Sequence, residues 1–165
     1  MSKAFRVGMY GGKFMPYHLG HLFCLETASR LCGKVYQLLM VGCVEEEAIL
    51  RSAPAWEREM LSPAYRFEHM LEAGKRLGNV ETVLMDISRC RTPEGEEDWD
   101  AETPLVLDIC GHFDAVFGSE PSYAPYFERA YPWAVYIQVD PPRINYPISG
   151  TAIRNGREKA EKWTV

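Results

Sequence analysis

A short apolar strand near the start of the chain runs directly into a segment rich in glycine and histidine. The predicted strand Phe5–Tyr10 is followed by Gly11-Gly12-Lys13-Phe14-Met15-Pro16-Tyr17-His18-Leu19-Gly20-His21. The paired glycines let the backbone pass close to a bulky anion, because neither carries a Cβ. Residues 22–31 have helical apolar spacing, so the free N–H groups of a helix N-terminus should point into the same space. The segment therefore predicts a phosphate site between a strand and a helix.

A metal site and a purely structural role are the alternatives for the two histidines. Zinc needs three or four ligands, whereas His69, His112 and the five cysteines show no ligand spacing. By composition, His-x-Gly-His arises by chance in about one in a hundred chains of this length. The residues that precede it make chance a poor explanation. We favour the phosphate site and expect no metal ligand from the protein itself.

The size and charge of the chain limit what it can bind. Its 165 residues are predicted to form one domain, 1–165. A net charge of −5 argues against a broad nucleic-acid surface. No apolar run is long enough to span a membrane, and the N-terminus lacks a signal-peptide core. The cysteines fit a reducing compartment. We expect a cytoplasmic protein that binds neither nucleic acid nor membrane, and a homo-oligomer stays open.

Apolar, β-rich segments alternate with helical patterns along the chain. The later predicted strands are Val35–Cys43, Val80–Ile87, Asp114–Gly118 and Ala134–Val139. The predicted helices after the first are Pro63–Leu77, Thr103–Gly111, Tyr123–Ala130 and a last one from about Thr151. This alternation predicts an α/β fold, a doubly wound five-stranded parallel sheet with helices on both faces. Ligands of such sheets bind beyond the carboxyl ends of the strands, where the histidine segment lies.

Two stretches do not fit the framework of strands and helices. Glu45–Ser62 and Ser88–Asp100 are predicted to be irregular, and the second is a candidate lid or a solvated loop. Its acidic residues are expected to face solvent.

A second motif lies near the C-terminus. The chain reads Tyr146-Pro-Ile-Ser-Gly-Thr-Ala-Ile-Arg154, in which Ser149 and Thr151 are placed to cap a helix. Arg154, one turn further, offers a fork of donors suited to phosphate oxygens. Alone this pattern is an ordinary helix start, but with the histidine segment it forms a two-part signature.

The two motifs together resemble those of the HxGH nucleotidyltransferase (cytidylyltransferase-like) superfamily, and within it the NadR-type nicotinamide mononucleotide (NMN) adenylyltransferases. The resemblance spans nearly the whole chain and includes Tyr65–Met70, Val116–Pro121, Ala124–Tyr126 and Val139–Arg143. Two departures stand out. Trp99 lies in an unusually acidic stretch, and no Gly-x-x-x-x-Gly-Lys-Ser/Thr kinase motif occurs. The resemblance implies a Rossmann-like nucleotidyltransferase fold and a transferase domain alone.

The resemblance also implies a reaction and a set of site residues. AMP would pass from ATP to the 5′-phosphate of NMN, giving NAD and pyrophosphate, with Mg²⁺ carried by the ATP phosphates. The implied catalytic residues are His18, His21, Lys13 and Arg154. The implied ATP contacts are Gly12, Phe14, Gly20, Gly118, Glu120, Ile148, Ser149 and Thr151. The pyridine nucleotide would contact Trp99, Arg66 and Arg143.

Several of these assignments have simpler alternatives. Glu120 fits a helix start, Trp99 fits a lid anchor, and Arg143 fits a surface ion pair. Asp98 and Asp100, beside Trp99, are expected to attract the cationic ring of NMN and to disfavour its acid form. Adenylyl transfer to another phosphomonoester, such as nicotinic acid mononucleotide or phosphopantetheine, stays open. So does a nucleotide-sensing regulator without catalysis.

Overall fold

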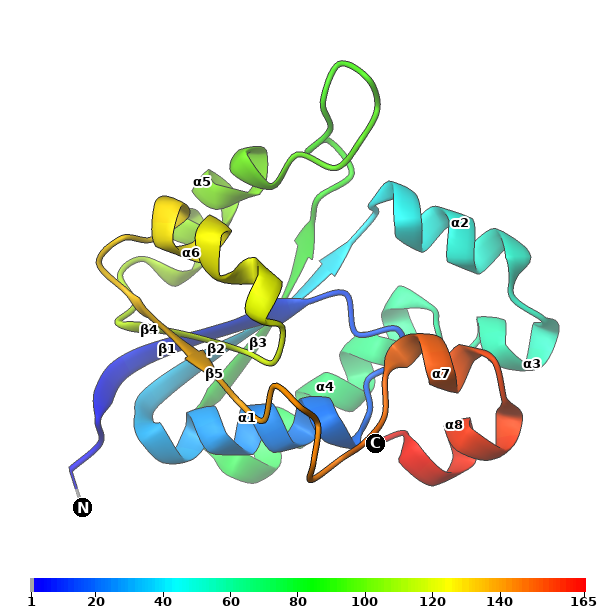
Figure 1. Ribbon diagram of the computed structural model, residues 1–165, viewed down its shortest axis with the longest axis horizontal. Coiled ribbons are helices and arrows are strands. Elements are labelled where there is room, and N and C mark those ends of the chain that lie inside the picture. Colours follow the sequence, from blue (N-terminus) through cyan, green and yellow to red (C-terminus); the bar gives the residue numbers. More distant parts are fainter. Residues whose placement is uncertain (1) are drawn as a thin grey trace.

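Five parallel strands form one sheet in the order β3-β2-β1-β4-β5 (Figure 1) in the computed structural model, which describes residues 2–165 and, at positions 157 and 158, the backbone alone. The strands are β1 (Phe5–Gly12), β2 (Cys32–Val41), β3 (Val80–Asp86), β4 (Ala115–Gly118) and β5 (Val135–Gln138). The predicted fold class, a doubly wound parallel sheet, is confirmed.

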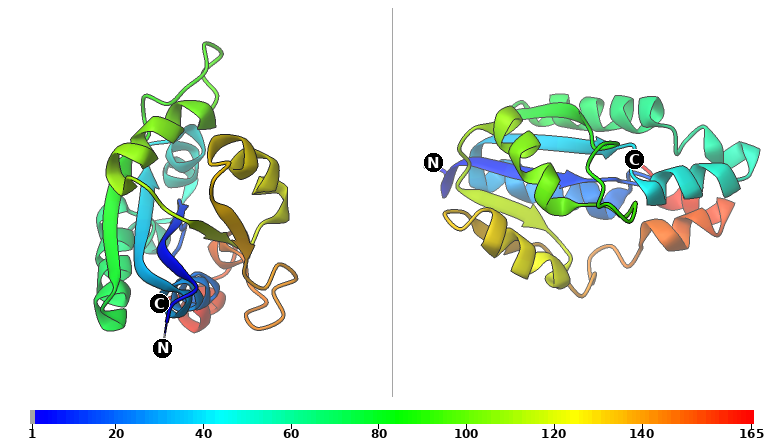
Figure 2. Two further views of the ribbon diagram at one scale, coloured as in Figure 1. Left: turned by 90° about the vertical axis from the view of Figure 1, so that its left-hand side faces the viewer. Right: turned by 90° about the horizontal axis from the view of Figure 1, so that it is seen from above.

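Helices cover both faces of the sheet (Figure 2). One face carries α1 (Leu19–Leu31) and α4 (Pro63–Leu77), and the other carries α5 (Trp99–Cys110) and α6 (Ala124–Ala130). Each face has its own apolar core. Leu25 and Met70 are buried in the first, and Val106 and Phe113 in the second. Burial of these side chains against the sheet is the main stabilising contribution expected of such layers.

The prediction that Glu45–Ser62 is irregular was wrong, because most of this segment is helical. It contains α2 (Val44–Ser52) and α3 (Ala55–Arg58), and only residues 53–54 and 59–62 are non-helical. Helix α2 begins where the Cys43 thiol accepts the backbone N–H of Glu46 at 3.3 Å. Three acidic residues in its first turn complement the partial positive charge of the helix N-terminus.

Other helix and strand boundaries also differ from the predicted ones. Strand β2 begins at Cys32, three residues before the predicted start, and α5 begins at Trp99 rather than Thr103. The Asp98 carboxylate accepts the backbone N–H of Ala101 at 3.2 Å and so caps α5 four residues early. The predicted last helix is two short helices, α7 (Gly150–Arg154) and α8 (Arg157–Trp163). The residues between Ser88 and Asp98 form the predicted irregular loop.

The strand order creates a crevice at the carboxyl ends of β1 and β4. The chain moves outward from β1 through β2 to β3, then crosses back to β4 on the other side of β1. The connections after β1 and β4 therefore leave in opposite directions, which opens a site between them. The loop between β3 and α5 projects beyond this end of the sheet (Figure 1). Within the described residues, no helix is long and apolar enough to cross a membrane.

Candidate active site

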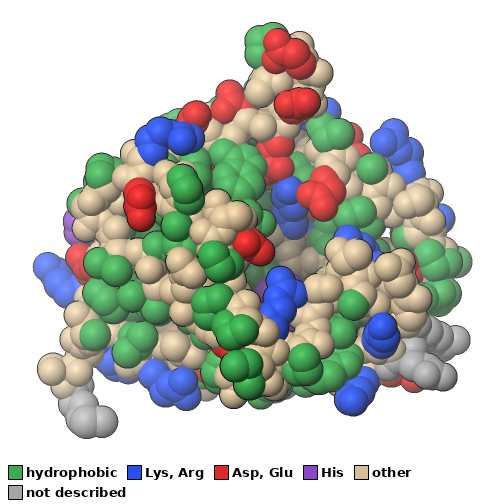
Figure 3. All heavy atoms as spheres, viewed as in Figure 1, with side chains coloured by type: hydrophobic (Ala, Val, Ile, Leu, Met, Phe, Trp, Pro, Cys, Tyr) green, Lys and Arg blue, Asp and Glu red, His purple; other side chains and the backbone are tan. Residues whose placement is uncertain are grey.

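A cavity of about 350 Å³ fills the crevice between the ends of β1 and β4. Figure 3 shows this face hollowed near its middle, with basic and acidic side chains close together at the rim. Glycines from both strand ends line the cavity, and a Cβ on Gly118 would come within 2.7 Å of the Tyr136 hydroxyl. The backbone can pass this close only because Gly118 has no side chain.

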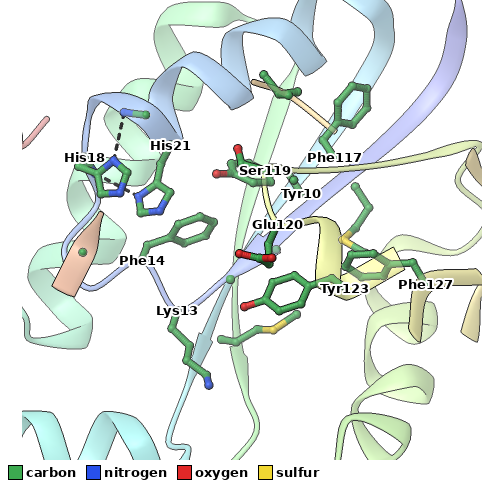
Figure 4. A pocket seen from close by; sticks show the side chains of 18 of the residues that line it. Tyr10, Lys13, Phe14, His18, His21, Phe117, Ser119, Glu120, Tyr123 and Phe127 are labelled. Carbon is green, nitrogen blue, oxygen red and sulfur yellow. Dashed lines mark hydrogen bonds between the residues drawn. The ribbon is translucent and has the colours of Figure 1, made fainter. Parts of the chain in front are cut away.

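Two histidines form the centre of the cavity wall. The rings of His18 and His21 stack with their centroids 3.6 Å apart (Figure 4). His18 is the N-cap of α1, and its Nδ1 accepts the backbone N–H of Gly20 at 3.1 Å. In return, the Nδ1 of His21 accepts the backbone N–H of His18 at 3.2 Å. This reciprocal capping fixes both rings, and in the neutral state it leaves the proton of each on Nε2.

The surroundings keep both histidines uncharged. Burial, and then the charge of Arg143, lower the pKa of His18 to about 4. Burial, the neighbouring His18 and Arg143 also lower the pKa of His21. In the described part of the chain, neither Nε2 has a hydrogen-bond partner. The pair therefore offers two neutral N–H donors to whatever occupies the cavity.

Lys13 lines the cavity, but carboxylates hold its ammonium group. Its Nζ lies 2.8 Å from Glu97 and 3.1 Å from Glu45. Although burial lowers the pKa of Lys13, these ion pairs raise it above the usual value, so the group stays charged. The Glu45 side chain is 63% exposed and that of Glu97 only 18%, so the pair with Glu97 is the stronger one.

Backbone strain gathers at the cavity. Phe14, Asp140 and Arg143 are the non-glycine residues with positive φ in the described chain, at 52°, 47° and 55°. All three line the cavity. A left-handed backbone is costly for such residues and persists where the surrounding structure holds it, often at functional sites.

The C-terminal motif lies beside the histidines. Ile148 and Gly150 line the cavity, and Ser149 caps α7 by accepting the backbone N–H of Ala152 at 3.2 Å. Arg154 donates to the Met15 carbonyl at 2.6 Å and to the Thr151 hydroxyl at 3.3 Å. Ser149, Thr151 and Arg154 are next to the cavity rather than in its wall. The structure thus brings the two sequence motifs together through Met15.

The end of β4 supplies another part of the wall. Gly118, Ser119 and Glu120 line the cavity together with Tyr123 (Figure 4). The backbone N–H of Ser122 donates to the Glu120 carboxylate at 3.1 Å and lowers its pKa. Glu120 therefore caps the short helix η1 (Pro121–Tyr123), the simpler of its two predicted roles, while it also faces the cavity.

The far end of the cavity is aromatic. Trp99 makes edge-to-face contacts with Tyr123 and Tyr126, at centroid distances of 5.0 and 5.1 Å. Val106 and Phe127 lie behind them, on α5 and α6. The cavity thus has one polar, nitrogen-rich end and one flat, largely aromatic end.

The structure does not bring Arg66 to the cavity, contrary to its predicted contact with the pyridine nucleotide. Arg66 is 1% exposed, and its guanidinium donates to the carbonyl of Leu61, to the carbonyl of Lys13 and to Glu46 at 2.7 Å. These bonds tie α4 to the Lys13 loop from behind. The other two predicted pyridine contacts, Trp99 and Arg143, do line the cavity.

The expected role of the acids beside Trp99 also changes. Asp98 caps α5, and Asp100 pairs with Arg129 on the surface at 2.9 Å. Of the acids near Trp99 in sequence, those that line the cavity are Glu97 and Glu102. Sequence reasoning had placed Glu97 among the solvated residues and had not considered Glu102. The only sequence signal for Glu102 is its place one turn after Trp99 on a helical pattern, and that signal is weak.

A profile of the Cytidylyltransferase-like family matches residues 9–156. The chain belongs to this family of nucleotidyltransferases, which contains the HxGH motif that His18 and His21 carry here. No curated protein sequence gives a significant match.

Solved structures with the same fold include proteins that bind or make pyridine nucleotides. A NadR protein in complex with NAD and AMP-PNP has a TM-score of 0.65 and 20% identity, over 98% of this chain and 46% of its own. A bifunctional NMN adenylyltransferase/ADP ribose pyrophosphatase from Francisella tularensis has a TM-score of 0.62 and 20% identity, over 92% of this chain and 41% of its own. Another structure of that protein contains AMP and a manganese ion.

A third relative has a length close to that of this chain. It is a protein proposed to be a nicotinate-nucleotide adenylyltransferase, from Vibrio parahaemolyticus, with a TM-score of 0.53 and 16% identity. The match covers 99% of this chain and 94% of that protein. By contrast, this chain spans less than half the length of the NadR and Francisella proteins. At these identities the likeness shows the fold alone.

Proposed function

We propose that this nucleotidyltransferase moves AMP from ATP to the 5′-phosphate of nicotinamide mononucleotide, giving NAD and pyrophosphate. The observation that carries the proposal is the stacked pair His18 and His21. Each Nδ1 is held by the backbone, and each Nε2 is free to donate into the cavity. Two fixed neutral donors at a helix N-terminus suit an α-phosphate whose negative charge grows during reaction.

In the proposed reaction, an oxygen of the mononucleotide phosphate attacks the α-phosphorus of ATP. The bond from that phosphorus to the bridging oxygen breaks, and pyrophosphate leaves with the electron pair. No side-chain nucleophile is needed, because the attacking phosphate is already an anion. Catalysis then consists of positioning and charge stabilisation.

Lys13 has the task of bringing two anions together. Its ammonium would lie between the α-phosphate and the attacking phosphate and reduce their repulsion. To do so it must leave at least one of its carboxylate partners, and Glu45 is the more exposed of the two. Arg143, whose charge lowers the pKa of both histidines and whose guanidinium donates to the Ile148 carbonyl at 2.9 Å, would contact a phosphate near them.

The second motif would hold the β- and γ-phosphates. Arg154 reaches the loop before the histidines through the Met15 carbonyl, and the hydroxyls of Ser149 and Thr151 lie on the same helix start. The adenosine would lie against the end of β4, where Gly118 and Glu120 border the cavity. Gly12, Phe14, Gly20 and Ile148 would complete the ATP-binding wall.

A Mg²⁺ ion carried by the ATP phosphates fits this donor set. The polar end of the cavity offers nitrogen donors, which bind phosphate oxygens rather than a cation. Among the described residues, no group of three or more His, Cys, Asp or Glu side chains is arranged to hold a metal ion. When bound, the ion would neutralise phosphate charge.

The flat end of the cavity supports a pyridine as the second substrate. Trp99 and Tyr123 present aromatic surfaces on which a planar cationic ring can stack. A phosphopantetheine arm is flexible and has no planar ring for such walls to hold. This contrast favours NMN, or its acid form, over phosphopantetheine.

The proposal is tested by pyrophosphate release from ATP and Mg²⁺ in the presence of single phosphomonoesters. We expect release with NMN at a rate far above that with phosphopantetheine. Release with phosphopantetheine alone would replace the pyridine assignment while keeping adenylyl transfer. No release with any acceptor, although ATP binds, would support a nucleotide-sensing regulator instead. The same protein carrying His21→Ala serves as the control for contaminating activity.

A further inference from the structure

One carboxyl group stands at the aromatic end of the cavity with part of its bonding capacity unused. Glu102 lies on α5, one turn after Trp99, and is 5% exposed. It lines the cavity, and its Oε1 is buried without a hydrogen-bond partner in the described part of the chain. A buried polar atom without a partner destabilises the fold unless something else satisfies it.

The carboxyl group of Glu102 is paired with that of Glu97. Burial, and then the hydrogen bond with Glu97, raise the pKa of Glu102 to about 9. Glu97 in turn accepts a hydrogen bond from the Lys13 ammonium at 2.8 Å. Burial raises the pKa of Glu97, but the hydrogen bonds from Glu102 and Lys13 outweigh this effect, so the pKa of Glu97 is lowered. At neutral pH the proton therefore resides on Glu102, and it is donated to the Glu97 carboxylate.

This arrangement determines which hydrogen bonds Glu102 can still form. Its only proton is used on Glu97, so the rest of the carboxyl group can only accept hydrogen bonds. A ligand group beside it must therefore donate. The carboxamide of a nicotinamide ring has an NH₂ group that donates, whereas the carboxylate of a nicotinic acid ring has no donor. The carboxylate would also bring a second negative charge close to Glu97.

We propose that the carboxyl group of Glu102 accepts a hydrogen bond from the carboxamide NH₂ of the pyridine ring and so makes the enzyme select the amide over the acid. This inference rests on the proposed function and names the residue that decides its substrate. The ring itself would lie among Trp99, Tyr123 and Val106. These residues supply flat and apolar walls, which do not distinguish the amide from the acid. Asp98 and Asp100, which have other partners, do not serve this purpose.

The first test compares three mononucleotides as acceptors for the wild-type protein: the carboxamide, the carboxylate and the 3-acetylpyridine analogue. The acetyl analogue is neutral and keeps the carbonyl but lacks the NH₂ donor. A site built around a hydrogen bond rejects analogues that lack the partner group, so kcat/KM should fall at least about tenfold for each of the other two. Equal kcat/KM for the amide and the acetyl analogue would overturn the role of Glu102.

The second test uses two variants at the same position. In Glu102→Gln the side-chain NH₂ can donate to Glu97 while the oxygen still accepts, so the preference for amide over acetyl should persist. In Glu102→Met the acceptor is lost, and the ratio of the two kcat/KM values should fall toward one. The KM for ATP should change little in both. Asp108→Ala, on the exposed side of the same helix, is the matched control and should keep the wild-type ratio.

The outcomes separate this inference from the function on which it rests. If NMN is adenylylated but Glu102→Met keeps the wild-type ratio, Glu102 does not select the amide and the proposed reaction still stands. If no pyridine nucleotide releases pyrophosphate, the proposed function fails together with the inference. If Glu102→Met does not fold, as judged by thermal unfolding, the wild-type comparison of amide and acetyl analogue still decides.

Discussion

Replacing His21 with alanine removes two separate features of the site. The ring is one of the two proposed donors to the α-phosphate, and its Nδ1 also accepts the backbone N–H of His18 at 3.2 Å. The first loss should act on the rate of the chemical step. The second should act on the stability of the start of α1.

The two losses have different magnitudes. Removal of one preorganised donor to a developing negative charge lowers kcat by about 10²–10³. Loss of one capping hydrogen bond at a helix N-terminus lowers the free energy of unfolding by about 1 kcal/mol. A protein of ordinary stability tolerates that change and stays folded at 25 °C. The KM for ATP should move much less than kcat, because the donor matters most in the transition state.

A matched variant separates catalysis from capping. Ser62 caps α4 by accepting the backbone N–H of Tyr65 at 3.2 Å, and it does not line the cavity. Ser62→Ala should therefore lower stability by a similar amount and leave kcat unchanged. Steady-state pyrophosphate release and chemical denaturation on both variants provide the comparison. A wild-type kcat in His21→Ala, or an equal loss of kcat in Ser62→Ala, would refute the catalytic role.

Three further expectations concern other parts of the site. Arg154→Ala should raise the KM for ATP by about tenfold, as for a lost charged hydrogen bond, with little change for NMN; equal weakening of both would make the motif structural. Trp99→Ala should raise the KM for NMN by about tenfold, from ring stacking, and abolish the quench of tryptophan fluorescence that NMN causes; a surviving quench would exclude Trp99. The lowered pKa of His18, about 4 against 6.5 in the unfolded chain, means that below pH 6.5 the unfolded state binds the proton first. The free energy of unfolding should therefore fall between pH 6.5 and 4, and chemical denaturation at several pH values checks it. The fall should be smaller in His18→Gln, and an equally steep fall in that variant would contradict the reasoning.

Structural elements could be predicted from the sequence where the residues that determine them are close together in the chain. The strand, the glycine pair and the capped helix are adjacent in the chain, so β1, His18 and the start of α1 could be predicted together. Alternating apolar patterns likewise predicted a parallel sheet, because β-strands joined by helices leave few other arrangements. Helix α2 was missed because its N-cap is Cys43, a residue type with little capping signal.

Side chains whose role depends on distant partners could not be predicted. Arg66, on a helix face, was predicted to contact the pyridine nucleotide, but it donates to the Lys13 carbonyl, 53 residues away in sequence, and is buried. The contact of Lys13 with Glu97 spans 84 residues and joins two loops whose closeness no local pattern reveals. The unsatisfied oxygen of Glu102 follows from the same packing. The prediction of one domain over 1–165 stays a prediction.

The central claim is transfer of an adenylyl group, and the fate of labelled ATP tests it most directly. ATP labelled with ³²P at the α-position is incubated with the protein, Mg²⁺ and NMN, and a parallel sample uses label at the γ-position. We expect the α-label in NAD and the γ-label in pyrophosphate, in equal amounts. Transfer of the γ-label to the mononucleotide, or release of both labels without a dinucleotide, would contradict the account.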